Sequence, residues 1–334
     1  MEDQREIALR AWCEAQTGTT QPQLEVVSGD ASFRRYFRAT DGKRSLIAVD
    51  CPPEKENMQP FVDVAEAYRD AGVTVPELIA VHPQKGFMLQ QDFGETLLLS
   101  KLNARSMQAF YQQALAALPN IMRVTRTATG NLEHYDAALL TREMRLFSEW
   151  LLAAHLQQPL ELREERLWNE VQQRLLDNAL EQPQVGVHRD YHSRNLMVLA
   201  NDELGIIDFQ DAVIGPITYD AVSLLRDCYV QWSAQDIDTL AQNFRELLQQ
   251  QQLLSAAIDV QTWQRWFDLM GMQRHLKAAG IFARLAYRDG KQGYLQDVPR
   301  TLGYLISISQ RYPEFTEFSD WLAQRVLPEV ERRQ

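Results

Sequence analysis

The stretch from Val187 to Phe209 constrains this chain more than any other part of the sequence. It reads Val-His-Arg-Asp-Tyr-His-Ser-Arg-Asn up to Asn195, and Ile-Ile-Asp-Phe at its end. Short apolar runs flank the polar residues, and each run is a strand candidate. These runs are Val185–His188, Leu196–Leu199 and Leu204–Asp208. The sequence therefore predicts a polar loop at the end of a buried strand, followed by a hairpin that ends in Asp208.

The polar residues of this stretch suit phosphoryl transfer. That reaction needs a carboxylate that orients the acceptor hydroxyl and takes its proton, and oxygen ligands that hold Mg²⁺ against nucleotide phosphates. Asp190 suits the first task, and Asn195 with Asp208 suits the second. Each residue alone would more simply cap a turn or end a strand, but the ordered set predicts a catalytic site. His188 is expected to hold the loop through its imidazole.

A second interpretation makes His188, Asp190 and His192 the ligands of a metal ion. Alternating residues of a strand point to the same face, as such a site would require. It is the weaker interpretation, because the chain has only six His and no other shows ligand spacing. His192 and Arg194 are also candidates for contact with the substrate or a phosphate, or simply parts of a solvated loop.

The triplet Asp92-Phe93-Gly94 matches the metal-binding DFG triplet of protein kinases. We reject it as the metal motif, because it precedes the polar loop by nearly one hundred positions and the metal-binding Asp must follow that loop. We expect a hinge there instead, whose backbone groups pair with adenine. The hinge residues are Gln90, Gln91, Asp92 and Phe93.

The first ninety residues change from one helix to short strands. The segment from Glu2 to Thr17 has apolar residues at helical spacing and predicts an amphipathic helix. Strand candidates follow, separated by Gly, Asp and Pro, with a further helix that starts near Pro60 and ends at Gly72. The candidates are Leu24–Val27, Phe33–Ala39, Leu46–Asp50, Leu78–His82 and Phe87–Gln91. They predict a small antiparallel α+β lobe over residues 1–93.

Residues 94–334 are predicted to form a larger, mainly helical lobe that contains the polar loop. Ser106 and Asp136 are candidate helix caps. Helix breaks are expected at Pro119, Gly130, Pro159, Gly290–Gly293 and Pro313. Asp220 opens a predicted helix and is expected to reach back to the backbone amides of the polar loop.

Composition narrows the class of protein. The chain has 334 residues, 45% of them hydrophobic, which is enough for two packed domains. A net charge of −11 without Lys or Arg runs argues against nucleic-acid partners and membrane surfaces. Three distant Cys suggest neither disulfides nor a zinc site. With no secretory signal pattern at the N-terminus, we expect a cytoplasmic protein with no obligate protein partner.

Several motifs together resemble the aminoglycoside phosphotransferase and choline kinase superfamily. They are His188-x-Asp190-x-x-x-x-Asn195, Ile207-Asp208-Phe209-Gln210 and Gly215-Pro216-x-x-Tyr219-Asp220. Three further segments look like the anomeric kinases of cell-wall recycling, which act on N-acetylmuramate and N-acetylglucosamine. These segments are Gly29–Phe37, Asp50–Glu54 and Met272–Lys277. The resemblance spans nearly the whole chain.

This resemblance implies a bilobal, protein-kinase-like fold and transfer of the ATP γ-phosphate to the anomeric hydroxyl of an amino sugar. Asp190 corresponds to the catalytic base, and Asn195 and Asp208 to the Mg²⁺ ligands. A turn between the first two strands would lie over the phosphates of ATP. Its residues are Ser28, Gly29, Asp30, Ala31, Ser32 and Phe33.

The chain departs from the kinase pattern at the end of the third strand, where a phosphate-binding lysine is expected. It has Ile-Ala-Val-Asp there, ending at Asp50. Arg34, Arg35 or Lys55 would have to supply the positive charge, and we favour Arg35, because a guanidinium can grip phosphate with two hydrogen bonds. Glu66 is the candidate carboxylate partner of that cation.

The substrate pocket is expected in the helical lobe, because a sugar needs convergent polar groups beside an apolar wall. Candidate substrate residues, besides Asp190, His192 and Arg194, are Asp211, Asp227, Arg274 and His275. The lactyl carboxylate of muramate would favour a cation such as Arg274 or Lys277.

Two other functions stay open at this point. One is a kinase for another small alcohol or amine, such as an aminoglycoside, choline or homoserine. The other is a catalytically silent nucleotide-binding module, which the missing lysine supports.

Overall fold

The computed structural model describes residues 3–18, 22–28, 33–40 and 44–333. The chain divides into two compact units. The first comprises Met1–Leu102, Arg126–Asn131 and Arg194–Ala212, and the second comprises Asn103–Thr125, Leu132–Ser193 and Val213–Gln334. The segment expected to form the small lobe lies within the first unit, which also takes in three later segments. The lobe boundary at residue 93 remains a prediction.

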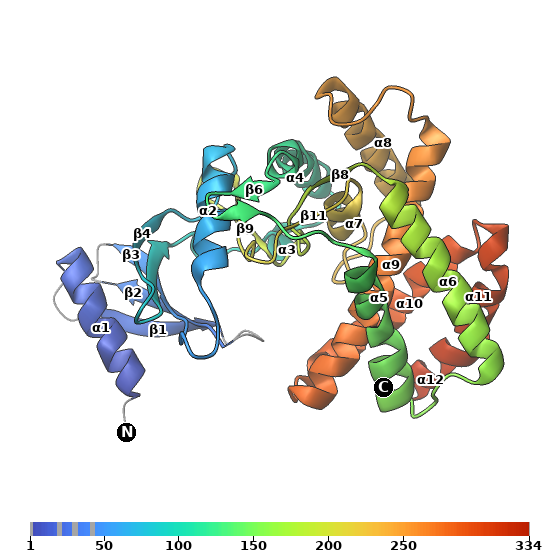
Figure 1. Cartoon of the computed structure of the whole chain (residues 1–334), viewed down its shortest axis with the longest axis horizontal. Coiled ribbons are helices and arrows are strands. Elements are labelled where there is room, and N and C mark those ends of the chain that lie inside the picture. The colour runs from blue at the N-terminus through green and yellow to red at the C-terminus, as the bar shows by residue number, and fades with distance from the viewer. Residues whose placement is uncertain (1–2, 19–21, 29–32, 41–43, 334) are drawn as a thin grey trace. The chain divides into compact units, whose positions relative to one another are not determined.

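The first unit is built on a five-stranded antiparallel sheet (Figure 1). Its strands are β1 (Gln23–Ser28), β2 (Arg35–Thr40), β3 (Ser45–Asp50), β4 (Leu78–His82) and β5 (Phe87–Gln91), in the order β1-β2-β3-β5-β4. The antiparallel arrangement predicted for these strands is confirmed. The fifth strand along the chain, β5, pairs with β3, and β4 pairs with the other side of β5.

Two helices pack within this unit. Helix α1 (Gln4–Thr17) buries Leu9, Trp12 and Cys13, which form one core cluster with Phe37 and Leu89 of the sheet. Helix α2 (Gln59–Asp70) begins with Pro60 in its first turn, where the missing N–H of proline has no partner to lose. Both helices lie where the apolar spacing placed them.

A hairpin from later in the chain joins the same unit. Strands β9 (Leu196–Val198) and β10 (Leu204–Ile206) pair antiparallel. The backbone N–H of Val198 donates to the carbonyl of Thr96, and that of Ile206 donates to the carbonyl of Thr74. The short helix α3 (Leu98–Lys101) and the two-residue strands β6 (Arg126–Thr127) and β7 (Gly130–Asn131) complete the unit.

The second unit is mainly helical. Its α-helices are α4 (Met107–Met122), α5 (Ala137–Leu146), α6 (Leu162–Glu181), α7 (Tyr219–Leu225), α8 (Ala234–Gln250), α9 (Val260–Arg288), α10 (Val298–Ser309), α11 (Thr316–Trp321) and α12 (Leu327–Arg332). Two π-helices are η1 (Phe147–His155) and η4 (Leu322–Val326), and two 3-10 helices are η2 (Gln292–Asp297) and η3 (Pro313–Phe315). One antiparallel pair, β8 (Gln184–Val187) with β11 (Val213–Pro216), carries the polar loop.

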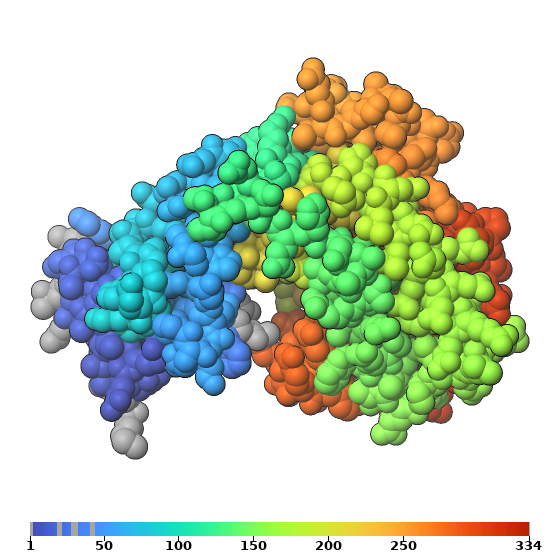
Figure 2. Space-filling view, in the orientation of Figure 1, coloured from blue at the N-terminus to red at the C-terminus, as the bar shows by residue number. Residues whose placement is uncertain are grey.

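Helix α9 is the centre of this unit (Figure 1). It packs against α5, α6, α7, α8 and α10, and every residue from Trp266 to Lys277 is buried. A helix surrounded on all sides normally carries apolar residues throughout. The buried Asp268, Arg274 and Lys277 of α9 are exceptions that need charged partners. Figure 2 shows α6, in yellow-green, extending over the near face of this unit.

The structure corrects some details of the sequence prediction. The break expected at Pro119 is wrong, because α4 runs through it while Leu118, Pro119 and Ile121 are all buried by packing. Ser106 precedes α4, but its side chain gives no capping bond, whereas Asp136 accepts a hydrogen bond from the N–H of Leu139 as expected. Strand β11 was not predicted. Among the helices of the described residues, none has the length and apolar character to cross a membrane.

Candidate functional site

The polar loop in the second unit is held by the carboxylate of Asp220. Strand β8 ends at Val187, and the next two backbone N–H groups donate to Asp220, that of His188 at 2.7 Å and that of Arg189 at 3.1 Å. Asp220 lies in the first turn of α7 and is 1% exposed. The predicted supporting role of Asp220 is thus confirmed. Burial raises the pKa of this carboxyl to about 6, although His188 and the two amide bonds oppose the shift.

The loop turns sharply at Arg189, whose φ angle is 76°. A residue other than glycine in the left-handed region is strained and is typical of functional sites. The turn brings the backbone N–H of Asp190 to 3.3 Å from Nδ1 of His188. His188 is fully buried, so it supports the loop from inside, as expected.

The far end of the loop is held by Asp227, which follows α7. Its Oδ2 accepts hydrogen bonds from both the N–H and the hydroxyl of Ser193, and its Oδ1 accepts one from the N–H of Tyr229. The side chain is 1% exposed. Both carboxylate oxygens accept hydrogen bonds from inside the protein. Asp227 therefore positions the end of the loop instead of making the substrate contact that was predicted for it.

Asp190 itself is half-buried among positive charges. Burial alone would raise its pKa. The charges of Lys277, His192 and Arg274 outweigh burial and lower the pKa to about 2. The group is therefore ionised at neutral pH and acts only as a hydrogen-bond acceptor. Burial lowers the pKa of His192 to about 4, so this ring is neutral beside Tyr229, whose ring centre lies 5.6 Å away.

A buried polar network lies beneath the loop. Glu143 of α5 pairs with Arg189 at 2.6 Å and with Lys277 at 3.2 Å. The hydroxyl of Tyr135 donates to Glu143, and the ammonium of Lys277 donates to the hydroxyl of Tyr219 at 3.2 Å. A buried ion pair of this kind holds together only if each charge has partners. The network therefore fixes Arg189, and with it the turn before Asp190.

Sequence reasoning missed Glu143 and Tyr135. The signal for Glu143 was present, since a carboxylate stands between Leu140 and Met144 on the apolar stripe of α5. Such a charge on a core-facing stripe needs a buried partner. Tyr135, which precedes α5, has no comparable signal in its sequence surroundings.

The two α9 candidates for substrate contact, Arg274 and His275, differ in their surroundings. His275 is 1% exposed, its Nε2 lies 2.9 Å from the carbonyl oxygen of Arg226, and its ring stacks on Tyr304. Its predicted substrate contact is therefore replaced by a core role. Arg274 is also buried, 6.0 Å from the centre of the Tyr219 ring, and its charge is one of those that lower the pKa of Asp190.

The two predicted metal ligands converge in the first unit. Asn195 stands directly before β9, and Asp208 stands two residues after β10, with φ of 65°. The amide nitrogen of Asn195 lies 3.1 Å from Oδ2 of Asp208, and the N–H of Ile207 donates to the carbonyl of Asn195. The amide nitrogen and oxygen of Asn195 are nearly equal in size, so a half-turn of the amide brings its oxygen toward Asp208. A carboxylate and an amide oxygen suit Mg²⁺, which keeps several waters and takes phosphate oxygens as its other ligands.

The alternative metal site at His188, Asp190 and His192 is not supported. These residues follow β8 in a loop and do not alternate along a strand. Nowhere in residues 3–18, 22–28, 33–40 and 44–333 do three His, Cys, Asp or Glu side chains gather in a way that could hold a metal ion. We keep the interpretation in which these residues form a polar loop that presents Asp190.

The turn expected over the phosphates lies largely outside the described residues. This holds for Gly29, Asp30, Ala31 and Ser32, while Ser28 ends β1. Phe33 is 63% exposed, and the ammonium of Lys55 lies 5.7 Å from its ring centre. Their contact with a nucleotide stays a prediction.

Arg35, which we favoured as the phosphate-binding cation, forms ion pairs with Asp50 and Asp3. Its carboxylate partner Asp50 is fully buried and also binds Arg5. Arg35 thus serves to neutralise the position where a lysine was expected. Glu66, the expected partner of the missing cation, is exposed on α2.

The hinge residues lie at the end of β5 and just beyond. Gln90 is buried in the strand, and the backbone N–H of Gln91 already donates to the carbonyl of Glu77. Pairing of the backbone with adenine, which stays a prediction, would therefore use other groups of the hinge. The carboxylate of Asp92 binds Arg38 at 2.7 Å, a structural role consistent with its rejection as a metal ligand. Phe93 packs on Gly205, where a Cβ would lie 2.5 Å from its ring.

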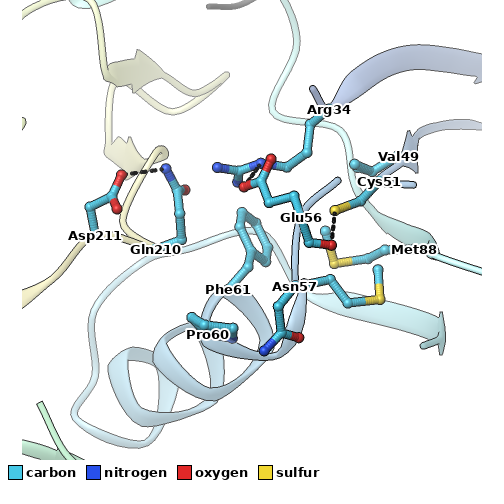
Figure 3. A pocket seen from close by; sticks show the side chains of 11 residues that line it. Arg34, Val49, Cys51, Glu56, Asn57, Pro60, Phe61, Met88, Gln210 and Asp211 are labelled. Atoms are coloured by element: carbon cyan, nitrogen blue, oxygen red, sulfur yellow. Dashed lines mark hydrogen bonds and ion pairs between the residues drawn. The ribbon is translucent and has the colours of Figure 1, made fainter. Parts of the chain in front are cut away.

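A pocket in the first unit lies beside the residues that follow Asp208 (Figure 3). Arg34, Glu56 and Phe61 line one part of it, and Gln210 with Asp211 line another. Asp211 is exposed and accepts a hydrogen bond from the Gln210 side chain at 3.3 Å. Arg194, the remaining substrate candidate, is half-buried before Asn195.

Similarity to known proteins agrees with this geometry. The model of the phosphotransferase enzyme family matches residues 23–257. A protein of Pseudomonas aeruginosa named N-acetylmuramate/N-acetylglucosamine kinase is 42% identical over 308 residues, which cover 90% of this chain and 89% of the relative. A protein of the same name from Neisseria meningitidis serogroup B is 38% identical over 330 residues, with coverage of 97% and 96%.

The fold is also that of solved kinases. The choline kinase LicA from Streptococcus pneumoniae superposes with a TM-score of 0.63 at 14% identity, over 91% of this chain and 100% of the other. The predicted α+β fold, with a small antiparallel sheet and a larger helical part, is confirmed. With a family match over most of the chain and close relatives along nearly its whole length, this protein belongs to the phosphotransferase enzyme family as a kinase of an alcohol group.

Proposed function

We propose that this protein uses ATP to phosphorylate the anomeric hydroxyl of N-acetylmuramate, N-acetylglucosamine or both, in the recycling of peptidoglycan. The observation that carries the proposal is the ionised Asp190, set in a loop that Asp220 and Asp227 hold at both ends. The names of the relatives with 42% and 38% identity support the choice of sugar. A cytoplasmic setting is part of this proposal.

In this proposal Asp190 accepts a hydrogen bond from the acceptor hydroxyl and takes its proton as the sugar oxygen bonds to the γ-phosphorus of ATP. The bond from that phosphorus to the bridging oxygen breaks, and ADP leaves. A carboxylate with a pKa near 2 is a weak base, so orienting the hydroxyl is its larger contribution. The anomeric hydroxyl of a sugar belongs to a hemiacetal and is more acidic than an ordinary alcohol. This acidity suits a weak base.

Asn195 and Asp208 would hold Mg²⁺, since their side chains meet and carry the amide and carboxylate oxygens that this ion prefers. When bound, Mg²⁺ neutralises charge on the phosphates of ATP. Arg274 and Lys277, both cationic neighbours of Asp190, would favour the lactyl carboxylate of muramate.

A coupled assay of ADP release tests the function, with Mg²⁺, ATP and each sugar in turn. We expect turnover with one or both amino sugars and little with choline, homoserine or an aminoglycoside. Transfer to the anomeric hydroxyl also removes the reducing end, so reducing-sugar signal should fall in step with ADP release. Turnover with preserved reducing ends would contradict the assigned position, and turnover only with another alcohol would contradict the substrate.

A catalytically silent module is distinguished by the same assay. Such a module would bind nucleotide, yet no acceptor would stimulate ADP release. Omission of Mg²⁺ should abolish turnover by a kinase of either substrate class.

A further inference from the structure

The end of β3 holds a carboxylate where kinases place a phosphate-binding lysine. Asp50 is fully buried and is neutralised by Arg5, with Nε at 2.9 Å from its Oδ1, and by Arg35, with Nε at 3.0 Å from its Oδ2. A cation that reaches the phosphates of ATP must therefore come from another position. In the described part of the first unit, three candidates for this cation lie near the starts of β2 and α2: Arg34, Arg35 and Lys55.

Arg34 differs from the other two in burial and in direction. It is 7% exposed, and its Nε lies 2.9 Å from Oε1 of Glu56. Its guanidinium lies 5.9 Å from the centre of the Phe61 ring. Figure 3 shows the Arg34 and Glu56 side chains turned toward each other above Phe61, inside the pocket. Arg35 is instead held by two carboxylates, and Lys55 lies by the exposed Phe33.

The same pocket connects Arg34 with the segment after Asp208. Phe61 packs against Phe209 at 4.7 Å between ring centres. Gln210, which lines the pocket, donates a hydrogen bond to Oδ1 of Asp208 at 3.0 Å. Burial lowers the pKa of Arg34, but the charges of Tyr36, Glu56 and Asp208 raise it by more, so the guanidinium stays protonated. Arg34 therefore belongs to the electrostatic surroundings of the predicted metal ligand.

The size of the pocket fits a phosphate group better than a whole nucleotide. Its volume is about 110 Å³, below the 300–1,000 Å³ that is usual for complete small-molecule sites. A guanidinium carries five N–H donors in a planar fork, so it can bind one carboxylate and one phosphate at the same time. Glu56 forms an ion pair on the Nε side of that fork, and Nη1 donates a hydrogen bond to the hydroxyl of Tyr36 at 3.4 Å.

We propose that Arg34 is the phosphate-binding cation of this kinase, that Glu56 holds it in position, and that the pocket they line receives a phosphate of ATP. The inference rests on the proposed function only for the identity of the nucleotide. It assigns the pair of charges that kinases otherwise build from β3 and a helix to the residue just before β2 and to the loop before α2.

Calorimetric binding of Mg·ATP and of adenosine, measured without sugar, tests this assignment. Arg34→Met should weaken ATP binding about tenfold or more, because a charge-assisted hydrogen bond is lost. Adenosine has no phosphate, so its affinity should stay within about twofold of wild type. Arg34→Lys should restore part of the ATP affinity, and Glu56→Gln should weaken it less than Arg34→Met. Arg69→Gln, an exposed arginine of α2, is the matched control and should bind both ligands like wild type.

Equal losses for ATP and adenosine would mean a structural role, and unchanged ATP affinity in Arg34→Met would remove Arg34 from the site. A tenfold loss in Arg35→Gln with normal binding in Arg34→Met would transfer the role to Arg35. Circular dichroism checks that each variant folds. If Arg34→Met does not fold, Arg34→Lys and Glu56→Gln serve as the test instead. Normal ATP binding by both of these variants would overturn the proposal. If wild type binds ATP but phosphorylates no sugar, the proposed function fails while this assignment stands; if it binds no ATP, both fail.

Discussion

Asp190 and Asp220 are two carboxylates of the same loop region with opposite surroundings. Asp190 is surrounded by the cations Lys277 and Arg274, and its pKa falls to about 2. Asp220 is buried against two backbone amides, and its pKa rises to about 6. The contrast shows that the residue type does not set the role. A carboxylate among cations is kept ionised for chemistry, whereas one among amides shapes the backbone.

The comparison is tested most strongly by Asp190→Asn. The amide keeps the size of the side chain but cannot take a proton, so we expect kcat to fall about 10²- to 10⁴-fold. Circular dichroism should change little, because Asp190 takes no part in the Asp220 or Asp227 bonds. The urea midpoint at neutral pH should fall only by the stability that the lowered pKa of Asp190 contributes. Turnover close to that of wild type would remove Asp190 from the chemical step.

Asp220→Ala should separate support from chemistry. It leaves the buried N–H groups of His188 and Arg189 without their acceptor, at a cost of about 4 kcal/mol in the free energy of unfolding. We expect both stability and kcat to fall, whereas Asp190→Asn leaves these two backbone hydrogen bonds in place and acts mainly on kcat. Urea denaturation followed by fluorescence measures the first effect. Full stability in Asp220→Ala would mean that the two amides find other partners, contrary to the assigned role.

The smallest effect is a pH dependence of stability. The folded pKa of Asp220, about 6, lies above its ordinary value of 3.8. The folded state therefore binds the proton more tightly, and the stability from this group is complete below pH 3.8 and is lost as pH rises through about 6. The stability advantage of wild type over Asp220→Asn should shrink by at most about 3 kcal/mol between pH 4 and 7. An advantage that grows over this range would reverse the sign of the assigned pKa shift.

Asp190 should show the opposite sign. Its folded pKa of about 2 lies below the ordinary 3.8, so its contribution is present above pH 3.8 and is lost as pH falls toward 2. Comparison of wild type with Asp190→Asn below pH 4 therefore sharpens the contrast.

The sequence predicted best those features that depend on local pattern. The five strands of the sheet, the helices α1 and α2, and the supporting role of Asp220 follow from alternation, spacing and capping. The order of polar residues from His188 to Asp208 predicted the kinase class because each residue has a chemical task. These signals lie in short segments and do not require knowledge of distant contacts.

What failed depends on contacts between distant segments. Pro119 should break a helix by local rules, but burial on both sides keeps α4 continuous. Asp227 and His275 resembled substrate residues until their buried partners became visible. Arg35 and Arg34 are neighbours in sequence, and only the position of Asp50 on the next strand shows that Arg35 is engaged.

The ion-paired Asp50 has a consequence for how such a kinase can change during evolution. Restoring a lysine at this position would place three positive charges together, since Arg5 and Arg35 already meet there. The substitution would be accepted only after both arginines had changed, and the Arg34 and Glu56 pair would carry nucleotide binding meanwhile. A lysine at this position would therefore need compensating changes at Arg5 and Arg35, and a single exchange at Asp50 would leave both arginines without their buried partner.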